Sequence, residues 1–182
     1  FSVENPAGTA AWKAVFQAVS AFNNCGLDLF GNFRSMLGYQ TDATVILTTA
    51  ALIILGGISF VVVADMGRMR RFGRLSVDSK IVLVTTLGLL VLGTVVILIT
   101  EYGNADTLGP LSFPYKLLNA FFHSVTPRTA GFSSINIGSM ATYSQFFTIL
   151  LMFVGGAAGS TAGGIKVNTF GMLAATIWST IR

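Results

Sequence analysis

The sequence has little charge and little reactive chemistry. Lys, Arg, Asp and Glu together make up 10% of its 182 residues, while 53% are hydrophobic. It holds one cysteine and one histidine, and a single cysteine excludes an intramolecular disulfide. It has no recognisable nucleophile–base pair, cluster of metal ligands or cofactor motif, so the sequence gives no reason to expect an enzyme or a bound cofactor. A composition this apolar predicts that most of the chain lies in a lipid bilayer.

Two long uncharged segments, with a basic stretch between them, predict membrane spans. Residues 43–64 and 81–100 contain 22 and 20 residues without a charge, and about 20 apolar residues suffice to cross the hydrocarbon core. Residues 65–80 carry five of the eleven basic residues, and a short basic loop between spans is typically cytoplasmic. The net charge of +4 is therefore better explained by a solvated inner loop than by nucleic-acid binding.

Two further apolar segments, at about 10–23 and 113–125, are too short to cross a bilayer. Each is followed by small or polar residues and a glycine, Gly26 or Gly131, and then by a long apolar segment. This pattern predicts half-helices that enter the membrane from outside and return as extended chain. The two units also resemble each other in sequence, which predicts two copies of a helix–pore loop–helix repeat.

This repeat defines the predicted organisation. Residues 1–64 form the pore loop and last helix of one unit, and residues 81–182 form a complete second unit that ends in a broken helix at about 142–182. The chain opens on Phe1 and its end also looks cut, so we expect a segment of a longer polypeptide. The predicted fold class is all-α: a polytopic membrane protein with re-entrant pore helices.

The pore loops have the chemistry of a cation-binding site. A half-helix that ends at the membrane centre directs a partial negative charge there, and extended backbone after it can replace a cation's hydration shell with carbonyl oxygens. The candidate ion-binding residues are Asn24, Cys25, Gly26, Thr129, Ala130 and Gly131. Because Asn24 and Thr129 differ, the loops offer unlike ligands, which predicts looser selectivity than in a symmetric channel. The alternative is a pair of ordinary interfacial turns.

A glycine-rich segment interrupts the last apolar stretch. Unwound backbone is tolerated at membrane depth only where protein buries it or a water-filled path passes. The candidate residues of this loop are Gly155, Gly156, Gly159, Ser160, Thr161, Gly163, Gly164 and Lys166. A lysine after glycines also suggests phosphate binding, but Ile165 occupies the lysine position of a P-loop and residues 146–154 are typical of a membrane helix. Lys166 is either part of the loop's function or a side chain that extends toward the cytoplasm.

Three motifs carry a family resemblance. They are SAFNNCGLD (residues 20–28), SVTPRTAGF (residues 124–132) and GGAAGSTAGGIK (residues 155–166). Together with the basic stretch at residues 65–80, here called the basic connector, they resemble the Trk/Ktr/HKT potassium transporter family, and most closely the bacterial Ktr membrane subunit. That family has four non-identical helix–pore loop–helix repeats, and the resemblance runs from the second repeat's pore loop through the third repeat.

The resemblance implies a function and an assembly. It implies K+ uptake across the cell membrane through a carbonyl-lined filter, with the glycine-rich loop as a gate below it and Na+ dependence as a family feature. It also implies a multi-pass homodimer of pore subunits in the lipid bilayer, with residues 65–80 cytoplasmic, bound to a cytosolic nucleotide-binding regulatory ring. The alternatives are a symmetric tetrameric cation channel with one pore loop per chain, and a non-conducting assembly or anchoring subunit.

Two side chains near the pore loops have predicted structural roles. Arg128 lies within a cation-binding segment, so its side chain must point away from the ion. Charges inside a membrane are usually paired, and Glu101 and Asp28 are the candidate partners. His123 is predicted to be a packed pore-helix residue rather than a pH sensor.

Overall fold

The computed structural model describes residues 6–31, 34–69 and 71–181. In this part of the chain the regular secondary structure is helical, apart from one isolated bridge between Val154 and Ile165. The helices are α1 (Ala7–Phe22), α2 (Ala43–Gly57), α3 (Phe60–Met69), α4 (Val77–Glu101), α5 (Phe113–Val125), α6 (Thr142–Phe153) and α7 (Val167–Ile181), with short 3-10 turns at Leu37–Tyr39, Phe72–Arg74 and Ile137–Ser139. The predicted all-α class is confirmed. Residues 1–5, position 70 of the predicted connector and residue 182 lie outside the described residues.

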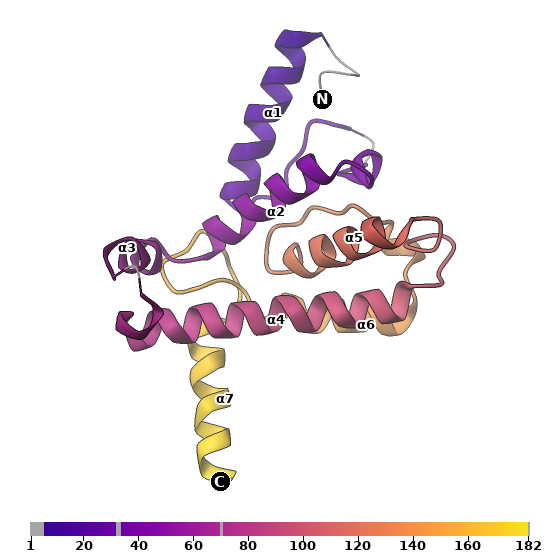
Figure 1. The fold of residues 1–182 in the computed structure, drawn as a ribbon. Helices are drawn as coiled ribbons and strands as arrows, with labels where there is room; N and C mark the ends of the chain where they lie inside the picture. The colour runs from indigo at the N-terminus through magenta and orange to yellow at the C-terminus, as the bar shows by residue number, and fades with distance from the viewer. Residues whose placement is uncertain (1–5, 32–33, 70, 182) are drawn as a thin grey trace.

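Helix α4 is the one helix, among the residues described, that is long and apolar enough to cross a bilayer by itself. It runs for 25 residues, and the predicted span 81–100 lies inside it. Ser76 precedes it, and the Ser76 hydroxyl accepts a hydrogen bond from the Ser79 amide at 3.2 Å. This cap satisfies an amide of the first turn that has no partner within the helix. In Figure 1, α4 is the long helix beneath α2 and α5.

The predicted span 43–64 is not one continuous helix, and in this respect the prediction was wrong. Helix α2 ends at Gly57, α3 begins at Phe60, and the two helices are bent by 96°. If the bent pair is one membrane segment, it is the second candidate span within the described residues. Asp65–Met69, predicted as the start of the connector, is the end of α3.

At the bend, the last carbonyl groups of α2 accept hydrogen bonds from another part of the chain and not from the next turn of a helix. The Gly56 and Gly57 carbonyls accept hydrogen bonds from residues of the loop 154–166. Ile58 is extended (φ −86°, ψ 131°), and the Ser59 hydroxyl accepts a backbone hydrogen bond at 3.3 Å from the first turn of α3. Glycine is also a poor helix former, by about 1 kcal/mol relative to alanine, so the helix loses little by ending here.

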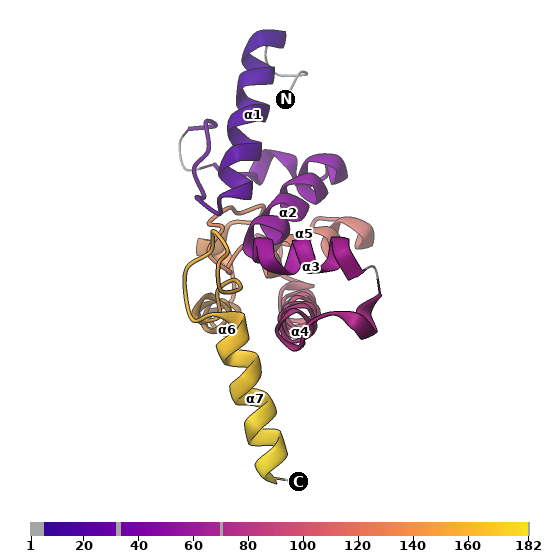
Figure 2. The same ribbon diagram turned by 90° about the vertical axis from the view of Figure 1, so that its left-hand side faces the viewer.

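Helices α5 and α6 pack along α4, and small residues bring α5 close. A Cβ atom on Gly93 of α4 would lie 2.2 Å from the Ser124 hydroxyl of α5, and this hydroxyl donates a hydrogen bond of 2.8 Å to the Leu90 carbonyl. Small residues and interhelical hydrogen bonds are what hold helices together in a bilayer, where lipid removes the hydrophobic driving force. Figure 2 looks nearly along α4 and shows α6 beside it.

The largest buried cluster joins α2, α4 and α5 to the segment that follows α5. Its members include Ile46, Leu90, Phe122 and Phe132. Phe132 comes directly after Gly131, so the core that holds the helices together also holds the second pore loop.

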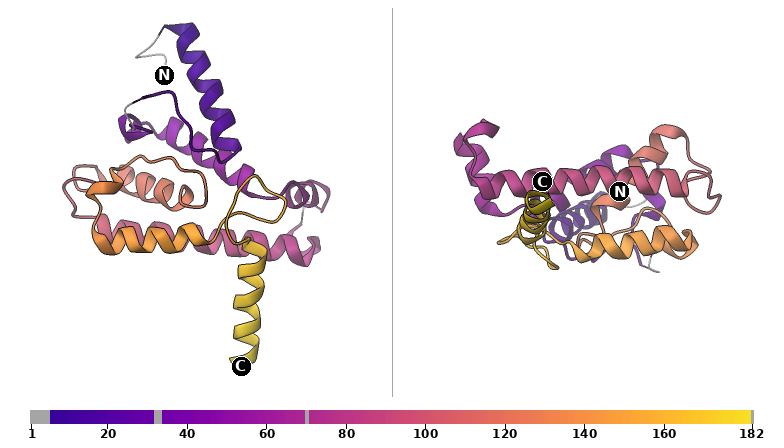
Figure 3. Two further views of the ribbon diagram at one scale, coloured as in Figure 1. Left: turned by 180° about the vertical axis from the view of Figure 1, so that it is seen from behind. Right: turned by 90° about the horizontal axis from the view of Figure 1, so that it is seen from below.

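Helices α1 and α7 project from this body in opposite directions (Figures 1 and 3). The predicted broken helix at about 142–182 consists of α6, the loop 154–166 and α7. Helix α7 does not continue α6; it runs across the direction of α4 (Figure 1). It is anchored at Gly171, where a Cβ atom would lie 2.6 Å from Ile81 and Thr85 of α4. Every described residue of α7 after Gly171 is exposed.

Candidate ion-binding loops and the glycine-rich loop

The first pore loop (residues 23–27) and the second pore loop (residues 126–132) touch each other at their glycines. Gly26 has a φ of +70° and Gly131 a φ of +77°, conformations that glycine adopts without steric cost. A Cβ atom on Gly26 would lie 2.7 Å from the Ala130 carbonyl oxygen, and one on Gly131 would lie 3.2 Å from the Gly26 Cα. Gly26 therefore needs glycine for conformation and for space, and Gly131 needs it for conformation at a tight contact.

The two loops also share their local geometry. Asn24 (φ 51°) and Thr129 (φ 74°) are left-handed residues that stand two positions before Gly26 and Gly131. Asparagine tolerates this conformation, but a β-branched residue such as threonine rarely adopts it. Strained backbone of this kind persists only where the surrounding structure holds it, and it clusters at ligand sites. The positive φ of Asn24 and Thr129 therefore identifies these two residues as corresponding positions of the two loops.

Each pore loop follows the C-terminal end of a half-helix. Helix α1 ends at Phe22 and α5 ends at Val125; the sequence predicted pore helices at about 10–23 and 113–125. The free carbonyls in the last turn of a helix carry a partial negative charge. Two such ends and two constrained loops of backbone carbonyls can stabilise a partly dehydrated monovalent cation.

Buried side chains and local hydrogen bonds support both loops. In the second loop, Ala130 is fully buried and Phe132 is 2% exposed. In the first loop, the Ser20 hydroxyl accepts a hydrogen bond from the Leu27 amide, and the Ser20 carbonyl accepts one from the Cys25 amide, both at 3.0 Å. The backbone of the second loop is thus held by its buried side chains and that of the first loop by hydrogen bonds to Ser20. The Cys25 side chain is exposed.

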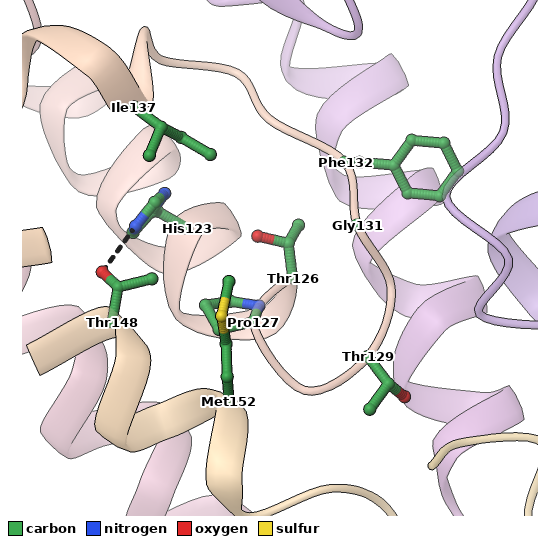
Figure 4. Close-up of a pocket in the computed structure, with 9 residues that line it drawn as sticks. All are labelled: His123, Thr126, Pro127, Thr129, Gly131, Phe132, Ile137, Thr148 and Met152. Carbon is green, nitrogen blue, oxygen red and sulfur yellow. Dashed lines mark hydrogen bonds between the residues drawn. The ribbon is translucent and has the colours of Figure 1, made fainter. Parts of the chain in front are cut away.

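A cavity of about 340 Å³ lies along the second pore loop (Figure 4). It is lined by His123, Thr126, Pro127, Thr129, Gly131, Phe132, Ile137, Thr148 and Met152. Figure 4 shows the His123 ring joined to Thr148 of α6, with Nε2 and Oγ1 3.1 Å apart. Only 1% of His123 is exposed, which agrees with the packed role predicted from the sequence.

Arg128 is directed into the helix packing. It is 8% exposed and lines a small gap together with Ile53 and Gly57 of α2 and Thr86 of α4. Its Nε has no hydrogen-bond partner among the described residues.

The two carboxylates considered as partners for Arg128 are engaged elsewhere. Glu101 accepts hydrogen bonds from the Thr107 hydroxyl at 2.7 Å and the Ala141 amide at 3.0 Å, so it ties the end of α4 to the start of α6. Asp28 accepts one from the Phe30 amide at 2.9 Å and closes a local turn. The structure therefore does not support either predicted pairing.

The glycine-rich loop, residues 154–166, is closed at its base. The Gly155 amide donates to the Ile165 carbonyl at 2.9 Å, and the Ile165 amide donates to the Phe153 carbonyl at 3.1 Å. A Cβ atom on Gly155 would lie 1.7 Å from the Gly163 carbonyl oxygen, so the two sides of the base can meet only because the residue is glycine. The Lys166 ammonium donates to the Ala162 carbonyl at 2.8 Å, so its charge is used within the loop.

The glycine-rich loop lies against α2 and the second pore loop. The Ala157 amide donates to the Gly57 carbonyl at 2.9 Å, and the Thr161 amide donates to the Gly56 carbonyl at 3.2 Å. The Gly163 amide donates to the Thr129 hydroxyl at 3.2 Å. Figure 3 shows the loop standing at the junction of α6 and α7, close to the end of α2.

Gly56 and Gly57 contact the glycine-rich loop, and the sequence interpretation did not select them as site residues. Gly56 has no space for a side chain, because a Cβ atom there would lie 1.8 Å from the Phe22 carbonyl oxygen. The signal was present in the internal repeat, since Gly56-Gly57 corresponds to Gly155-Gly156. Helix α2 ends at the second glycine of its pair, Gly57, and α6 ends at Phe153, two residues before its pair.

The fold and these loops define a class: a helical membrane protein with re-entrant pore loops. The family model described as "TrkH: Cation transport protein" matches residues 3–182. The chain therefore belongs to this family of membrane transport proteins.

Individual relatives are similar along most of this chain. Ktr system potassium uptake protein B from Bacillus subtilis (strain 168) is 41% identical over 171 residues, which cover 94% of this chain and 38% of the relative. Potassium/sodium uptake protein NtpJ from Enterococcus hirae is 44% identical over 162 residues, 89% of this chain and 35% of the relative. The chain thus spans little more than a third of the length of these relatives.

The fold also matches a solved structure. The potassium transporter TrkH from Vibrio parahaemolyticus superposes with a TM-score of 0.73 over 93% of this chain and 35% of that chain, at 18% sequence identity. At this identity, the likeness concerns the fold.

Proposed function

We propose that this chain supplies two of the pore loops and the gate of a protein that takes up K+ across the cell membrane, without covalent chemistry and without a cofactor. The contact between Gly26 and Gly131 carries the proposal, because it joins two unlike pore loops of one chain in the same left-handed conformation. The relatives at 41% and 44% identity are named as potassium and potassium/sodium uptake proteins, which supports K+ as the cargo.

In this proposal a partly dehydrated K+ passes between the pore loops. Backbone carbonyls replace part of its hydration shell, and the C-terminal ends of α1 and α5 supply partial negative charge. The residues that form this part of the filter are Asn24, Cys25, Gly26, Thr129, Ala130 and Gly131. Because one loop carries asparagine where the other carries threonine, we expect K+ to be preferred over Na+ less strictly than in a symmetric channel.

The glycine-rich loop is the proposed barrier, and α7 is the proposed lever. The first turn of α7 is bonded to the loop: the Val167 amide donates to the Gly156 carbonyl, and the Asn168 side chain accepts from the Ala158 amide, both at 3.0 Å. Asn168 also bonds Asp78 of α4. A displacement of α7 would therefore pull directly on the loop.

The assembly is proposed as a homodimer of pore subunits regulated by a cytosolic nucleotide-binding ring, with residues 65–80 on the cytoplasmic side and uptake dependent on Na+. The exposed length of α7, which includes Leu173, Ile177 and Trp178, supports a role for this helix in contacts outside the chain, because large exposed apolar surfaces mark interaction sites.

Rescue of growth tests the proposal. The full-length protein containing this segment should restore growth of a K+-uptake-deficient bacterium at low external K+, and Gly131→Ser should reduce K+ uptake and the preference for K+ over Na+. Gly103→Ser is the matched control, because no atom lies within 4 Å of the place that a Cβ atom on Gly103 would take. Its variant should behave as the parent protein.

Two results would overturn the proposal. Failure of the expressed parent protein to carry K+ would favour a non-conducting assembly or anchoring subunit. Normal uptake and normal K+/Na+ preference in Gly131→Ser would remove the filter assignment. A symmetric tetrameric channel with one pore loop per chain predicts no dependence on Gly26, and loss of uptake on substitution of Gly26 would exclude it.

A further inference from the structure

The corresponding residues of the two pore loops, Asn24 and Thr129, both bind the glycine-rich loop. The Asn24 amide nitrogen Nδ2 lies 3.0 Å from the Thr161 hydroxyl. The Thr129 hydroxyl accepts the Gly163 amide at 3.2 Å. The two contacts are two residues apart on the glycine-rich loop, so each pore loop has its own attachment point there.

The direction of the Asn24 hydrogen bond follows from the surroundings of Thr161. The Thr161 hydroxyl has one proton, and it lies 2.9 Å from the Gly56 carbonyl and 3.2 Å from the Phe22 carbonyl. Carbonyl oxygens can only accept, so the hydroxyl donates to them and must accept from its third neighbour. Asn24 is therefore the donor.

The two attachment points thus have opposite polarity. Asn24 donates to a side chain of the glycine-rich loop, whereas Thr129 accepts from its backbone. This gives a physical reason for the difference between the loops. The Thr161 hydroxyl donates its proton to backbone carbonyls, so its partner at position 24 must be a donor, and an amide side chain provides one. Asn24 is 9% exposed and its Oδ1 has no partner among the described residues, so Thr161 provides its one side-chain hydrogen bond in the described chain.

We propose that Asn24 and Thr129 are positioning residues that hold the glycine-rich loop shut, Asn24 through the Thr161 hydroxyl and Thr129 through the Gly163 amide. Release of the loop then requires both pore loops to give up a hydrogen bond. This inference rests on the proposed function. A net contribution of one such hydrogen bond corresponds to about a 2- to 10-fold change in the equilibrium between shut and released loop.

The test is a double-mutant cycle in the full-length protein, measured as K+ flux in proteoliposomes. Thr161→Val removes the hydroxyl with little change of shape, and Asn24→Ala removes the amide. Asn24→Ala should raise flux about 2- to 10-fold, and Thr161→Val by at least as much, because it also removes the bonds from the hydroxyl to the Gly56 and Phe22 carbonyls. The double variant should show no more than the Thr161→Val effect, because the bond that Asn24→Ala would break is already gone. Thr161→Ser should return flux to the parent level.

Thr100→Val is the matched control, because the Thr100 hydroxyl donates to the Val96 carbonyl inside α4 at 2.8 Å and not to a pore loop or to the glycine-rich loop. Flux in Thr100→Val should equal that of the parent. Additive effects of the two substitutions, or unchanged flux in Thr161→Val, would overturn the proposal.

A further variant and the parent protein complete the design. Should Thr161→Val or Asn24→Ala fail to reach the membrane, Thr129→Val tests the second attachment alone and should also raise flux; unchanged flux there would overturn the proposal. Absence of K+ flux in the parent protein would reject the proposed function itself. Normal flux in the parent with no response to these variants would reject only the role of Asn24 and Thr129.

Discussion

At the scale of single residues, each pore loop contains a glycine with a positive φ that lies against the other pore loop. Gly26 is the tightest case, because its φ is +70° and a backbone carbonyl stands 2.7 Å from where its Cβ would lie. A carbonyl of the neighbouring loop cannot rotate away as a flexible side chain could. Strain and crowding therefore coincide at this residue.

Gly26→Ala should abolish most K+ uptake, and Gly31→Ala is its matched control. Gly31 has a φ of +73° but no atom within 4 Å of a Cβ position, so both variants carry the left-handed strain of about 1–2 kcal/mol. Only Gly26→Ala adds the clash, which at about 1–3 kcal/mol should reduce uptake roughly 10-fold or more relative to Gly31→Ala. Equal uptake in the two variants would show that contact between the pore loops is dispensable.

At the scale of elements, helix packing and loop closure both use glycine, for different reasons. In α4, Gly93 lets α5 approach, whereas Gly88 of the same helix has nothing within 4 Å. In the glycine-rich loop, Gly155 lets two chain segments cross at the base. The first use brings two helices of the body together, and the second lets the glycine-rich loop close at its base.

Gly93→Ala should destabilise the protein by about 1–3 kcal/mol through overpacking against Ser124. Gly88→Ala, in the same helix, should be neutral or stabilising by up to about 1 kcal/mol because alanine is the better helix former. Thermal unfolding of the purified protein in detergent, followed by the far-ultraviolet helical signal, measures both. A lower melting temperature for Gly88→Ala than for Gly93→Ala would contradict the described packing of α4 against α5.

Deletion of Ala157–Ala162 should raise K+ flux, because it removes the part of the glycine-rich loop that bonds α2 and Asn24 while leaving the crossing at Gly155. Flux in proteoliposomes, normalised to the amount of folded protein, is the measurement. A deletion variant that folds and conducts like the parent would mean that this loop is no barrier.

At the scale of the whole molecule, the distribution of basic residues predicts the orientation in the membrane. The basic connector leads into α4 and the loop after Glu101 follows it, so the two lie at opposite ends of α4. The connector should therefore face the cytoplasm and the loop after α4 the outside.

Single cysteines can test this orientation. In a Cys25→Ala background, Gly73→Cys should react with a membrane-impermeant thiol reagent only after the cells are opened, whereas Gly103→Cys should react on intact cells. Both glycines are exposed and have no neighbour within 4 Å of a Cβ position, so neither substitution should disturb the fold. Labelling in the reverse order would invert the proposed topology.

The sequence by itself determined the features that depend on local composition. The length of the uncharged segment in α4, the short apolar half-helices α1 and α5 and the positions of Gly26, Gly131 and the glycine-rich loop could all be predicted, because hydrophobic length and backbone freedom are properties of neighbouring residues. Only the tertiary structure decided the bend after Gly57, the partners of Glu101 and the hydrogen bond between Asn24 and Thr161. These depend on which distant groups satisfy a buried carbonyl, carboxylate or hydroxyl, and that pairing is settled only when the helices have packed.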